Sequence, residues 1–277
     1  MTTCYFVSDL HGDTNKYELL AQEVIKRKPS FLFLGGDLLP HVRVSDKSRD
    51  NSVNPFINDY IIPLFVRIQK QLGCNYPEVY LIAGNDDYKT DVHGFIEGHK
   101  KGLWKYLNSE RVKFGPYTIY GYSYVPPTPF RIKDWEKYDV DSTTLDGSIS
   151  PNDGFRSNGD IYDNSLISRD LAQLTENSDM TKAIFLFHSP PYNSSLDKIP
   201  DNKNIGSRAI ADLISEKQPY VTLHGHAHES SRLANAWHDV IGRTHSFSAA
   251  WDGEGLAIVI FKIDEPSDCQ RQILTRT

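Results

Sequence analysis

The first ninety residues alternate between short apolar runs and longer segments whose apolar residues recur at helical spacing. Apolar runs occupy residues 4–8, 31–34 and 79–83, whereas the segments 17–25 and 56–72 repeat apolar residues every three or four positions. Strands that alternate with helices predict a largely parallel sheet, in which each strand is hydrophobic along its length because both faces are buried. We therefore expect an α/β fold.

The pattern changes after residue 112. Closely spaced apolar and aromatic residues at 112–124 surround Gly115-Pro116 and predict a hairpin. The segment 126–160 is rich in Pro, Asp, Ser, Asn and Gly, and we interpret it as a long surface insertion, a lid or a disordered loop. Helices are predicted near 162–174 and 207–215, and strands at 183–187, 220–223, 244–249 and 256–263, of which the last two close the chain. Without a linker or a repeat, residues 1–277 are expected to form a single domain.

Polar clusters follow five of the predicted strands. Taken alone, each cluster is ordinary, because Gly-Asp and Gly-Asn are common turn dipeptides and a single histidine is usually structural. The alternating histidines of the fifth cluster are too dense for an accident of composition. Since the carboxyl ends of neighbouring parallel strands share one edge of a sheet, the five clusters are expected to converge there. They are Ser8-Asp9-Leu10-His11, Gly35-Gly36-Asp37, Gly84-Asn85-Asp86-Asp87, His188-Ser189-Pro190-Pro191 and His224-Gly225-His226-Ala227-His228.

These clusters supply oxygen and nitrogen ligands without thiolate, a set that suits Mn, Fe, Ni or Zn. Seven candidate ligands are too many for one tetrahedral site, and they fit two divalent or trivalent ions that share a carboxylate. The candidates are Asp9, His11, Asp37, Asn85, His188, His226 and His228, while His224 is expected to be structural or to orient a ligand.

The ordered motifs DxH, GD, GN, H and GHxH resemble those of the calcineurin-like metallophosphoesterase family. The resemblance spans Asp9 to His228 and implies a four-layer α/β/β/α sandwich of two mixed sheets, with a dinuclear metal site at the carboxyl ends of the strands. It also implies that Asp37 bridges the two ions. One ion is then held by Asp9, His11 and His228, and the other by Asn85, His188 and His226.

One position departs from the family pattern. Where the family commonly has a histidine that protonates the leaving oxygen, this chain has Asp86. Beside two cations a carboxylate is expected to stay ionised, which makes Asp86 a poor general acid. The enzyme then favours good leaving groups, or His93, His99 or a lid residue supplies the proton. Asp87 aligns with the acidic residue of the family and is expected to orient the turn.

Composition excludes several classes of protein. Thirty Lys and Arg against 36 Asp and Glu give a net charge of −6, which disfavours extended nucleic acid as a partner. The longest apolar runs are far shorter than the roughly 20 residues that a membrane-spanning helix needs. Three widely spaced cysteines are expected to be reduced thiols, and the amino terminus lacks the pattern of a secretory signal. We therefore expect a cytoplasmic protein.

The expected function is metal-dependent hydrolysis of a small phosphomonoester or phosphodiester by attack of a metal-bridging hydroxide, with Asn85 and Asp86 as catalytic residues. Arg43 and Arg131 are candidate phosphate contacts, as are Lys133 and Arg156. Phe130 or Trp135 could stack on a base, or both aromatic residues only pin the insertion to the body. A nuclease and a non-catalytic scaffold of the same fold remain alternatives. The metal, the substrate and the oligomeric state stay open.

Overall fold

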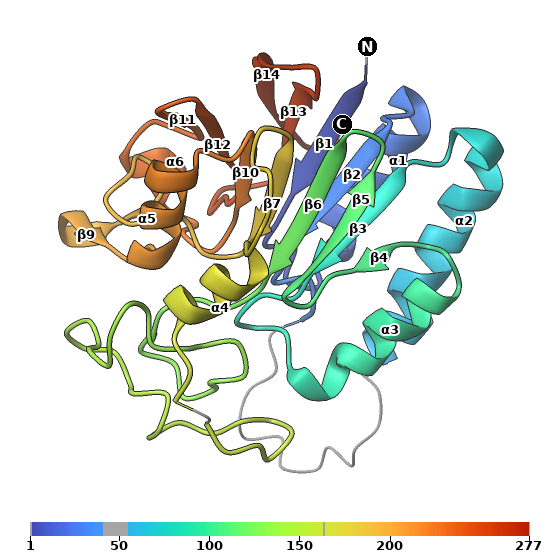
Figure 1. The fold of residues 1–277 in the computed structure, drawn as a ribbon. Helices are drawn as coiled ribbons and strands as arrows, with labels where there is room; N and C mark the ends of the chain where they lie inside the picture. The colour runs from blue at the N-terminus through green and yellow to red at the C-terminus, as the bar shows by residue number, and fades with distance from the viewer. Residues whose placement is uncertain (1, 41–54, 163, 277) are drawn as a thin grey trace.

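Two six-stranded sheets pack face to face in the computed structural model, which describes residues 2–40, 55–162 and 164–276 (Figure 1). The strand order is β14-β13-β1-β2-β3-β4 in the first sheet and β11-β12-β10-β7-β6-β5 in the second. Each sheet combines a parallel centre with antiparallel strands at its edge, so both are mixed. No helix in these ranges is both long and apolar enough to cross a membrane.

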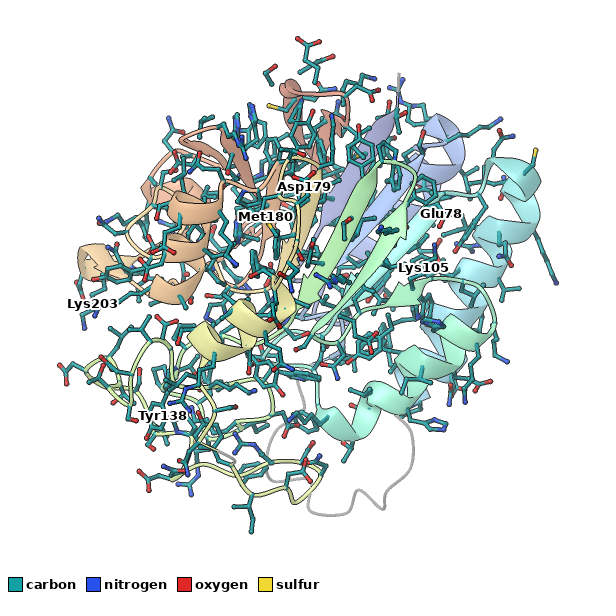
Figure 2. The ribbon with its side chains drawn as sticks, viewed as in Figure 1. Glu78, Lys105, Tyr138, Asp179, Met180 and Lys203 are labelled. Atoms are coloured by element: carbon teal, nitrogen blue, oxygen red, sulfur yellow. The ribbon has the colours of Figure 1, made fainter. Side chains whose placement is uncertain are left out.

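The first sheet takes four strands from the amino-terminal part of the chain and two from its carboxyl-terminal part. In its parallel centre Tyr5, Leu32 and Val79 lie side by side. At its edge Lys105 of β4 and Glu78 of β3 form an ion pair of 3.0 Å (Figure 2). Its strands are β1 (Thr3–Val7), β2 (Phe31–Gly35), β3 (Glu78–Ile82), β4 (Lys105–Tyr106), β13 (Leu256–Lys262) and β14 (Glu265–Leu274). The outer face carries α1 (Thr14–Arg27), η1 (Ile57–Ile61), α2 (Ile62–Leu72), η2 (Gly73–Asn75), η3 (Lys89–Asp91) and α3 (Val92–Lys100).

The second sheet has a parallel centre of β6, β7, β10 and β12, with β5 and β11 antiparallel at the edges. Its strands are β5 (Glu110–Phe114), β6 (Tyr117–Tyr122), β7 (Ala183–Phe187), β10 (Val221–His224), β11 (His238–Ile241) and β12 (Thr244–Ser248). The other elements of this half are α4 (Ile167–Leu174), β8 (Lys198–Ile199), η4 (Pro200–Asn202), β9 (Lys203–Asn204), α5 (Arg208–Lys217) and α6 (Ser230–Leu233).

Three apolar layers separate the sheets and helices. Successive side chains of a strand point to opposite faces. Leu32 of β2 therefore packs toward the outer helices, in the same cluster as Phe65 of α2, while Phe33 faces the second sheet and shares a cluster with Ile184. The third cluster joins β7 to α4 and α5. Three cores between four layers confirm the α/β/β/α sandwich that the resemblance implies.

The element order follows the sequence pattern closely, with a few corrections. The helix expected at 162–174 begins only at Ile167, and the strand 256–263 does not close the chain, because β14 follows it. A polar edge strand such as β14 has only one partner and carries no strong apolar pattern. The helix α3 was not predicted, since Gly94 and Gly98 weaken its helical signal. A Cβ at Gly98 would lie 1.9 Å from the Trp104 ring, which explains why glycine is needed there.

The segment 126–160 has little regular structure, yet it is not a loose surface loop. It lies at the edge of the molecule toward which β6 runs (Figure 1), and Figure 2 places Tyr138 within it. Trp135 is 1% exposed and belongs to the core beneath α2 and α3. Lys133 and Glu136 are also buried and form an ion pair of 2.6 Å. The segment is therefore anchored to the body, as the pinning interpretation of Trp135 predicts.

Candidate metal centre

The segments that follow β1, β2, β3, β7 and β10 meet at one place between the two sheets. Hydrogen bonds tie them together across the interface. The backbone N–H of Asp9 donates to Gly36, and the His188 ring Nδ1 lies 2.8 Å from the carbonyl oxygen of Gly35. The N–H of His226 donates to the Asp9 carboxylate. The convergence expected from the strand order is present.

Asp9, His11, Asp37 and His228 form one group, in which one ligand atom from each residue lies within 4.8 Å of every other. The Nε2 atoms of His11 and His228 are 3.2 Å apart. The His228 Nε2 is 3.1 Å from Asp9 Oδ1, and the His11 Nε2 is 3.9 Å from Asp37 Oδ2. Two nitrogen ligands of a tetrahedral ion at about 2.1 Å are roughly 3.4 Å apart, so this spacing suits a shared ion.

Asn85 and His188 form a second group, which also approaches Asp37. The His188 Nε2 lies 3.0 Å from Asn85 Oδ1 and 3.3 Å from Asp37 Oδ2. The His188 Nδ1–H donates to the carbonyl oxygen of Gly35. The ring is therefore fixed with Nε2 toward the amide oxygen of Asn85 and the carboxylate oxygen of Asp37. The ring of His226 is 5.3 Å from that of His188, centroid to centroid. Asp37 thus stands between the two groups.

The backbone of these turns is tightly constrained. Asp9 and Asp37 have φ values of 57° and 53°, in the left-handed region that is costly for residues other than glycine. At Gly84 an added Cβ would lie 2.2 Å from Asp37 Oδ1. The buried Asp87 carboxylate accepts the N–H groups of Leu38, Leu39 and Gly84 and so joins the β2 and β3 turns. Strain and close approach of this kind are typical of functional sites.

The electrostatics of the centre couple buried carboxylates to imidazoles. Burial raises the pKa of Asp9 and Asp37, but the facing histidines outweigh it and hold both well below the usual range. Burial lowers the pKa of His188 and His228, yet the carboxylates raise these values to about 10 and about 9. For His226, burial and then the charge of His188 lower the pKa to about 3. Two buried carboxylates are therefore held as anions that face imidazoles.

These residues fit a pair of cations. In the described ranges the Asp9 and Asp37 carboxylates form their ion pairs with histidine rings and none with lysine or arginine. Carboxylate, amide and imidazole donors without thiolate suit the borderline and hard ions expected from the sequence. Both carboxylates are almost fully buried, and cations would compensate their charge.

His224 has a different role from the other histidines in its run. Its Nδ1 lies 2.9 Å from the carbonyl oxygen of Ser189, and its Nε2 lies 2.8 Å from Thr222 Oγ1. The ring is fully buried and stacks on Phe187. The Nδ1 contact thus joins the ends of β7 and β10, while the Nε2 contact lies within β10.

Asp86 lies at the rim of the centre and is partly exposed. Its backbone N–H donates to Asp37 Oδ1, and its carboxylate accepts the Asn85 amide and lies 3.7 Å from His11 Nδ1. Burial, and next the charge of Asp37, raise the pKa of Asp86 to about 8. The charges of the protein alone thus favour a protonated Asp86 near neutral pH, whereas the ionised state expected from the sequence depends on nearby cations.

The residues predicted to contact substrate lie in different environments. Arg43 lies outside the described residues, and Arg131 is exposed on the insertion, where its carbonyl pairs with Phe155. Lys133 is committed to Glu136, and Arg156 packs over Tyr162 and donates to backbone carbonyls. His93 and His99 are exposed on α3, with His99 Nδ1 accepting the N–H of Tyr106.

Two supporting residues were not predicted. Ser8 Oγ donates to the Asp9 carboxylate, and Lys16 Nζ donates to the Asp9 carbonyl at 3.2 Å. Ser8 precedes the aspartate directly, so its position in the first cluster carried a signal. Lys16 lies on α1, and its helical position alone gave none.

Comparison with known proteins agrees with this geometry. The family model for calcineurin-like phosphoesterases matches residues 2–230, while no curated protein matches the chain. One solved structure has a TM-score of 0.64 at 14% identity and covers 99% of both chains. The protein TT1561 of Thermus thermophilus has a TM-score of 0.58 at 13% identity and covers 98% of both chains. At such identities these likenesses show the fold alone. Because the family model covers most of the sequence, the chain belongs to the calcineurin-like phosphoesterase family and is a hydrolase that acts on phosphoester bonds.

Proposed function

We propose that this protein hydrolyses a small phosphorylated substrate, a phosphomonoester or phosphodiester, with two metal ions at the centre described above. The observation that carries the proposal is the position of Asp37 between the two groups. Its Oδ2 lies 3.9 Å from His11 Nε2 of the first group and 3.3 Å from His188 Nε2 of the second. A single carboxylate oxygen close to both groups supports a site for two ions.

Asp9, His11 and His228 would hold one ion, and Asn85, His188 and His226 the other. When bound, such a pair acidifies a water molecule and neutralises the charge of a phosphoryl group. The chain keeps its ligands in fixed orientations, because Gly35 fixes the His188 ring and Ser8 and the His226 backbone hold Asp9. Preorganised ligands of this kind need little rearrangement during the reaction.

Asp86 lies at the rim of the centre with the buried Asn85 beside it, and a phosphoryl group would meet both residues there. The Asn85 amide group both approaches His188 and donates to Asp86 at 3.0 Å. Asp86 occupies the position from which the histidine common in the family protonates the leaving oxygen, so its protonation state sets whether this step is catalysed. If it is ionised in the working enzyme, good leaving groups are preferred, because general acid catalysis typically contributes about 10²- to 10⁴-fold.

The test combines metal analysis with two chromogenic esters. The protein is loaded separately with Mn, Fe, Ni and Zn, the bound metal is counted, and hydrolysis of p-nitrophenyl phosphate and bis(p-nitrophenyl) phosphate is measured. We expect about two ions per chain and metal-dependent turnover of at least one ester, and the preferred ester identifies the substrate class. Two bound ions without turnover of either ester would contradict hydrolysis of simple esters and favour the scaffold.

A further inference from the structure

The turn that carries Asn85 and Asp86 continues into residues 87–90, and the insertion holds this continuation. The Trp135 indole Nε1–H donates to the carbonyl oxygen of Asp87 at 2.6 Å. The backbone N–H of Lys89 donates to Asp134 Oδ2 at 2.7 Å, and that of Thr90 to Ser157 Oγ at 3.3 Å. Three contacts therefore bind the insertion to the backbone directly after the turn.

The insertion residues that make these contacts are themselves rigidly held. Asp134 is fully buried and accepts the N–H of Ser157 at 2.8 Å, while the Ser157 hydroxyl bonds its other oxygen. Trp135 packs in the core, and the Lys89 ammonium group lies 5.4 Å from its ring centroid. One carboxylate thus links two segments of backbone that are distant in sequence, and a buried acceptor of this kind is costly to lose.

On its other side the turn is fixed by Asp87, whose carboxylate accepts the N–H groups of Leu38, Leu39 and Gly84. The side chain of Asp87 therefore anchors the turn to the end of β2, and its carbonyl anchors it to the insertion. Asn85 and Asp86 lie between Gly84 and Asp87, in the part of the turn that these contacts enclose.

We infer that Asp134 and Trp135 are positioning residues, through which the insertion braces the Asn85–Asp86 turn against the metal centre. The segment 126–160 then acts as a fixed support for this turn, which extends the pinning interpretation and departs from the lid or disordered loop that the sequence also allowed. The kinetic part of this inference rests on the proposed function. Because a shift of about 1 Å in a reacting group can cost roughly 10²-fold in rate, loss of the brace is expected to lower kcat.

The first experiment compares Trp135→Phe with Trp104→Phe. Both substitutions keep an aromatic ring and remove an indole donor. Trp104 is a matched control because its buried Nε1–H donates at 2.8 Å to the carbonyl oxygen of Phe95 in α3. Amide hydrogen exchange is measured on the purified proteins with a chelator present. We expect the Lys89 and Thr90 amides to exchange about tenfold faster or more in Trp135→Phe and at the wild-type rate in Trp104→Phe.

Kinetics on the metal-loaded proteins provide the second measurement. We expect Trp135→Phe to lower kcat on p-nitrophenyl phosphate, or on its bis ester, by about 10- to 100-fold with KM changed much less. Trp104→Phe should leave kcat close to wild type at temperatures where both variants are folded. A merely structural role for Trp135 would lower the melting temperature of both variants without separating their kcat values.

Asp134→Ala and Asp134→Asn keep the inference testable if Trp135→Phe folds poorly. Alanine removes both acceptor oxygens and should match the loss in Trp135→Phe, whereas asparagine keeps one oxygen and should give intermediate exchange and kcat. Wild-type exchange at Lys89 and Thr90 in Asp134→Ala or Trp135→Phe would overturn the brace. An inactive wild-type enzyme would instead contradict the proposed function, and the exchange rates would still decide the brace.

Discussion

Two clusters of buried charge in this protein differ in how their charge is compensated. In the insertion, Glu136 is paired with Lys133 at 2.6 Å and also accepts the N–H and the hydroxyl of Thr128. At the metal centre, Asp9 and Asp37 face only imidazoles among their ion-pair partners in the described ranges. In the first cluster the charge of Glu136 is compensated by Lys133. In the second, the charges of Asp9 and Asp37 are compensated only when the facing histidines are protonated.

This difference separates a structural polar cluster from one that can bind cations. A buried ion pair with all its hydrogen bonds satisfied needs nothing further and has little affinity for an added ion. At the metal centre the pKa of His188 is raised to about 10 and that of His228 to about 9, after burial has lowered them, because each faces a buried carboxylate. A divalent cation can replace these protons, so the same electrostatics that raise the pKa of histidine also favour metal binding.

The largest effect is expected from Asp37→Ala, which removes the carboxylate between the two groups. We expect loss of bound metal and a fall in kcat/KM of about 10³-fold or more, because metal ions supply several kcal/mol of transition-state stabilisation. Metal counting and hydrolysis of the p-nitrophenyl esters check this. Glu97→Ala on the surface of α3 is the control, since Glu97 pairs only with the exposed Lys101 in the described structure. An Asp37→Ala enzyme that keeps two ions and most of its activity would remove the basis of the comparison.

Lys133→Met tests the buried Lys133–Glu136 pair of the insertion, because it leaves Glu136 buried and without its charged partner. Removing one partner of a buried pair costs about 3–5 kcal/mol of the free energy of unfolding. Urea denaturation should show this loss, and it should shrink in acid, where Glu136 becomes protonated. The double variant Lys133→Met, Glu136→Leu should recover most of the stability. If the single variant is as stable as wild type, the pair is not a closed structural unit.

The sequence predicted the convergence of the candidate ligands better than it predicted the structure of the insertion, for a physical reason. Asp9, Asp37 and His188 each follow a short buried strand. Because the carboxyl ends of parallel strands share one edge of a sheet, the positions of such residues can be predicted. Lys133 and Trp135 lie in a segment without periodicity, so no pattern told whether they face solvent or the core. Lys133 therefore resembled a phosphate contact, although its charge is used inside the protein.

Asp86 marks another limit of prediction from sequence. Its ionisation depends on burial and on Asp37, which is 49 residues distant in sequence, and neither can be read from the motif. The polar edge strand β14 was missed because an edge strand needs no apolar pattern. The metal identity, the contacts of Arg43 and Arg131 with substrate, the single-domain organisation and the cytoplasmic location stay predictions.

Metal binding should stabilise the folded protein by compensating the buried charges of Asp9 and Asp37. At a free Mn²⁺ concentration of about 100 times Kd, a single site adds about 2.7 kcal/mol, which corresponds to roughly 5–10 °C in Tm for a chain of this size. Thermal denaturation with Mn²⁺ and with a chelator measures this shift. The Lys133→Met, Glu136→Leu variant should keep the full shift and Asp37→Ala should lose it. Equal shifts in these two variants would show that the ion binds elsewhere.

With a chelator present, stability should fall as the pH rises from 7 to 9. The pKa of Asp86 is raised to about 8 by burial and Asp37, and that of His228 to about 9, because Asp9 outweighs the effect of burial. In each case the folded state holds a proton that the unfolded chain has lost, so stability declines through this range. Urea denaturation at several pH values tests this, and Mn²⁺ should weaken the decline by replacing the protons. A flat profile with the chelator would contradict the assigned ionisation states.

The smallest effect is expected from Asp86→His, which returns the residue that the family commonly has at this position. If the ionised carboxylate limits proton transfer to the leaving group, an imidazole should raise kcat on a poorly activated ester such as phenyl phosphate by about tenfold or more. Activity on p-nitrophenyl phosphate should change little, since that leaving group needs no proton.

Asp86→Asn is the matched control, because it removes the charge without supplying an acid, and should not raise the rate on phenyl phosphate. Unchanged or lower activity of Asp86→His on both esters would mean that Asp86 is protonated in the working enzyme and already acts as the acid, or that proton transfer is not limiting. Loss of the phenyl phosphate rate in Asp86→Asn would select the first of these two explanations.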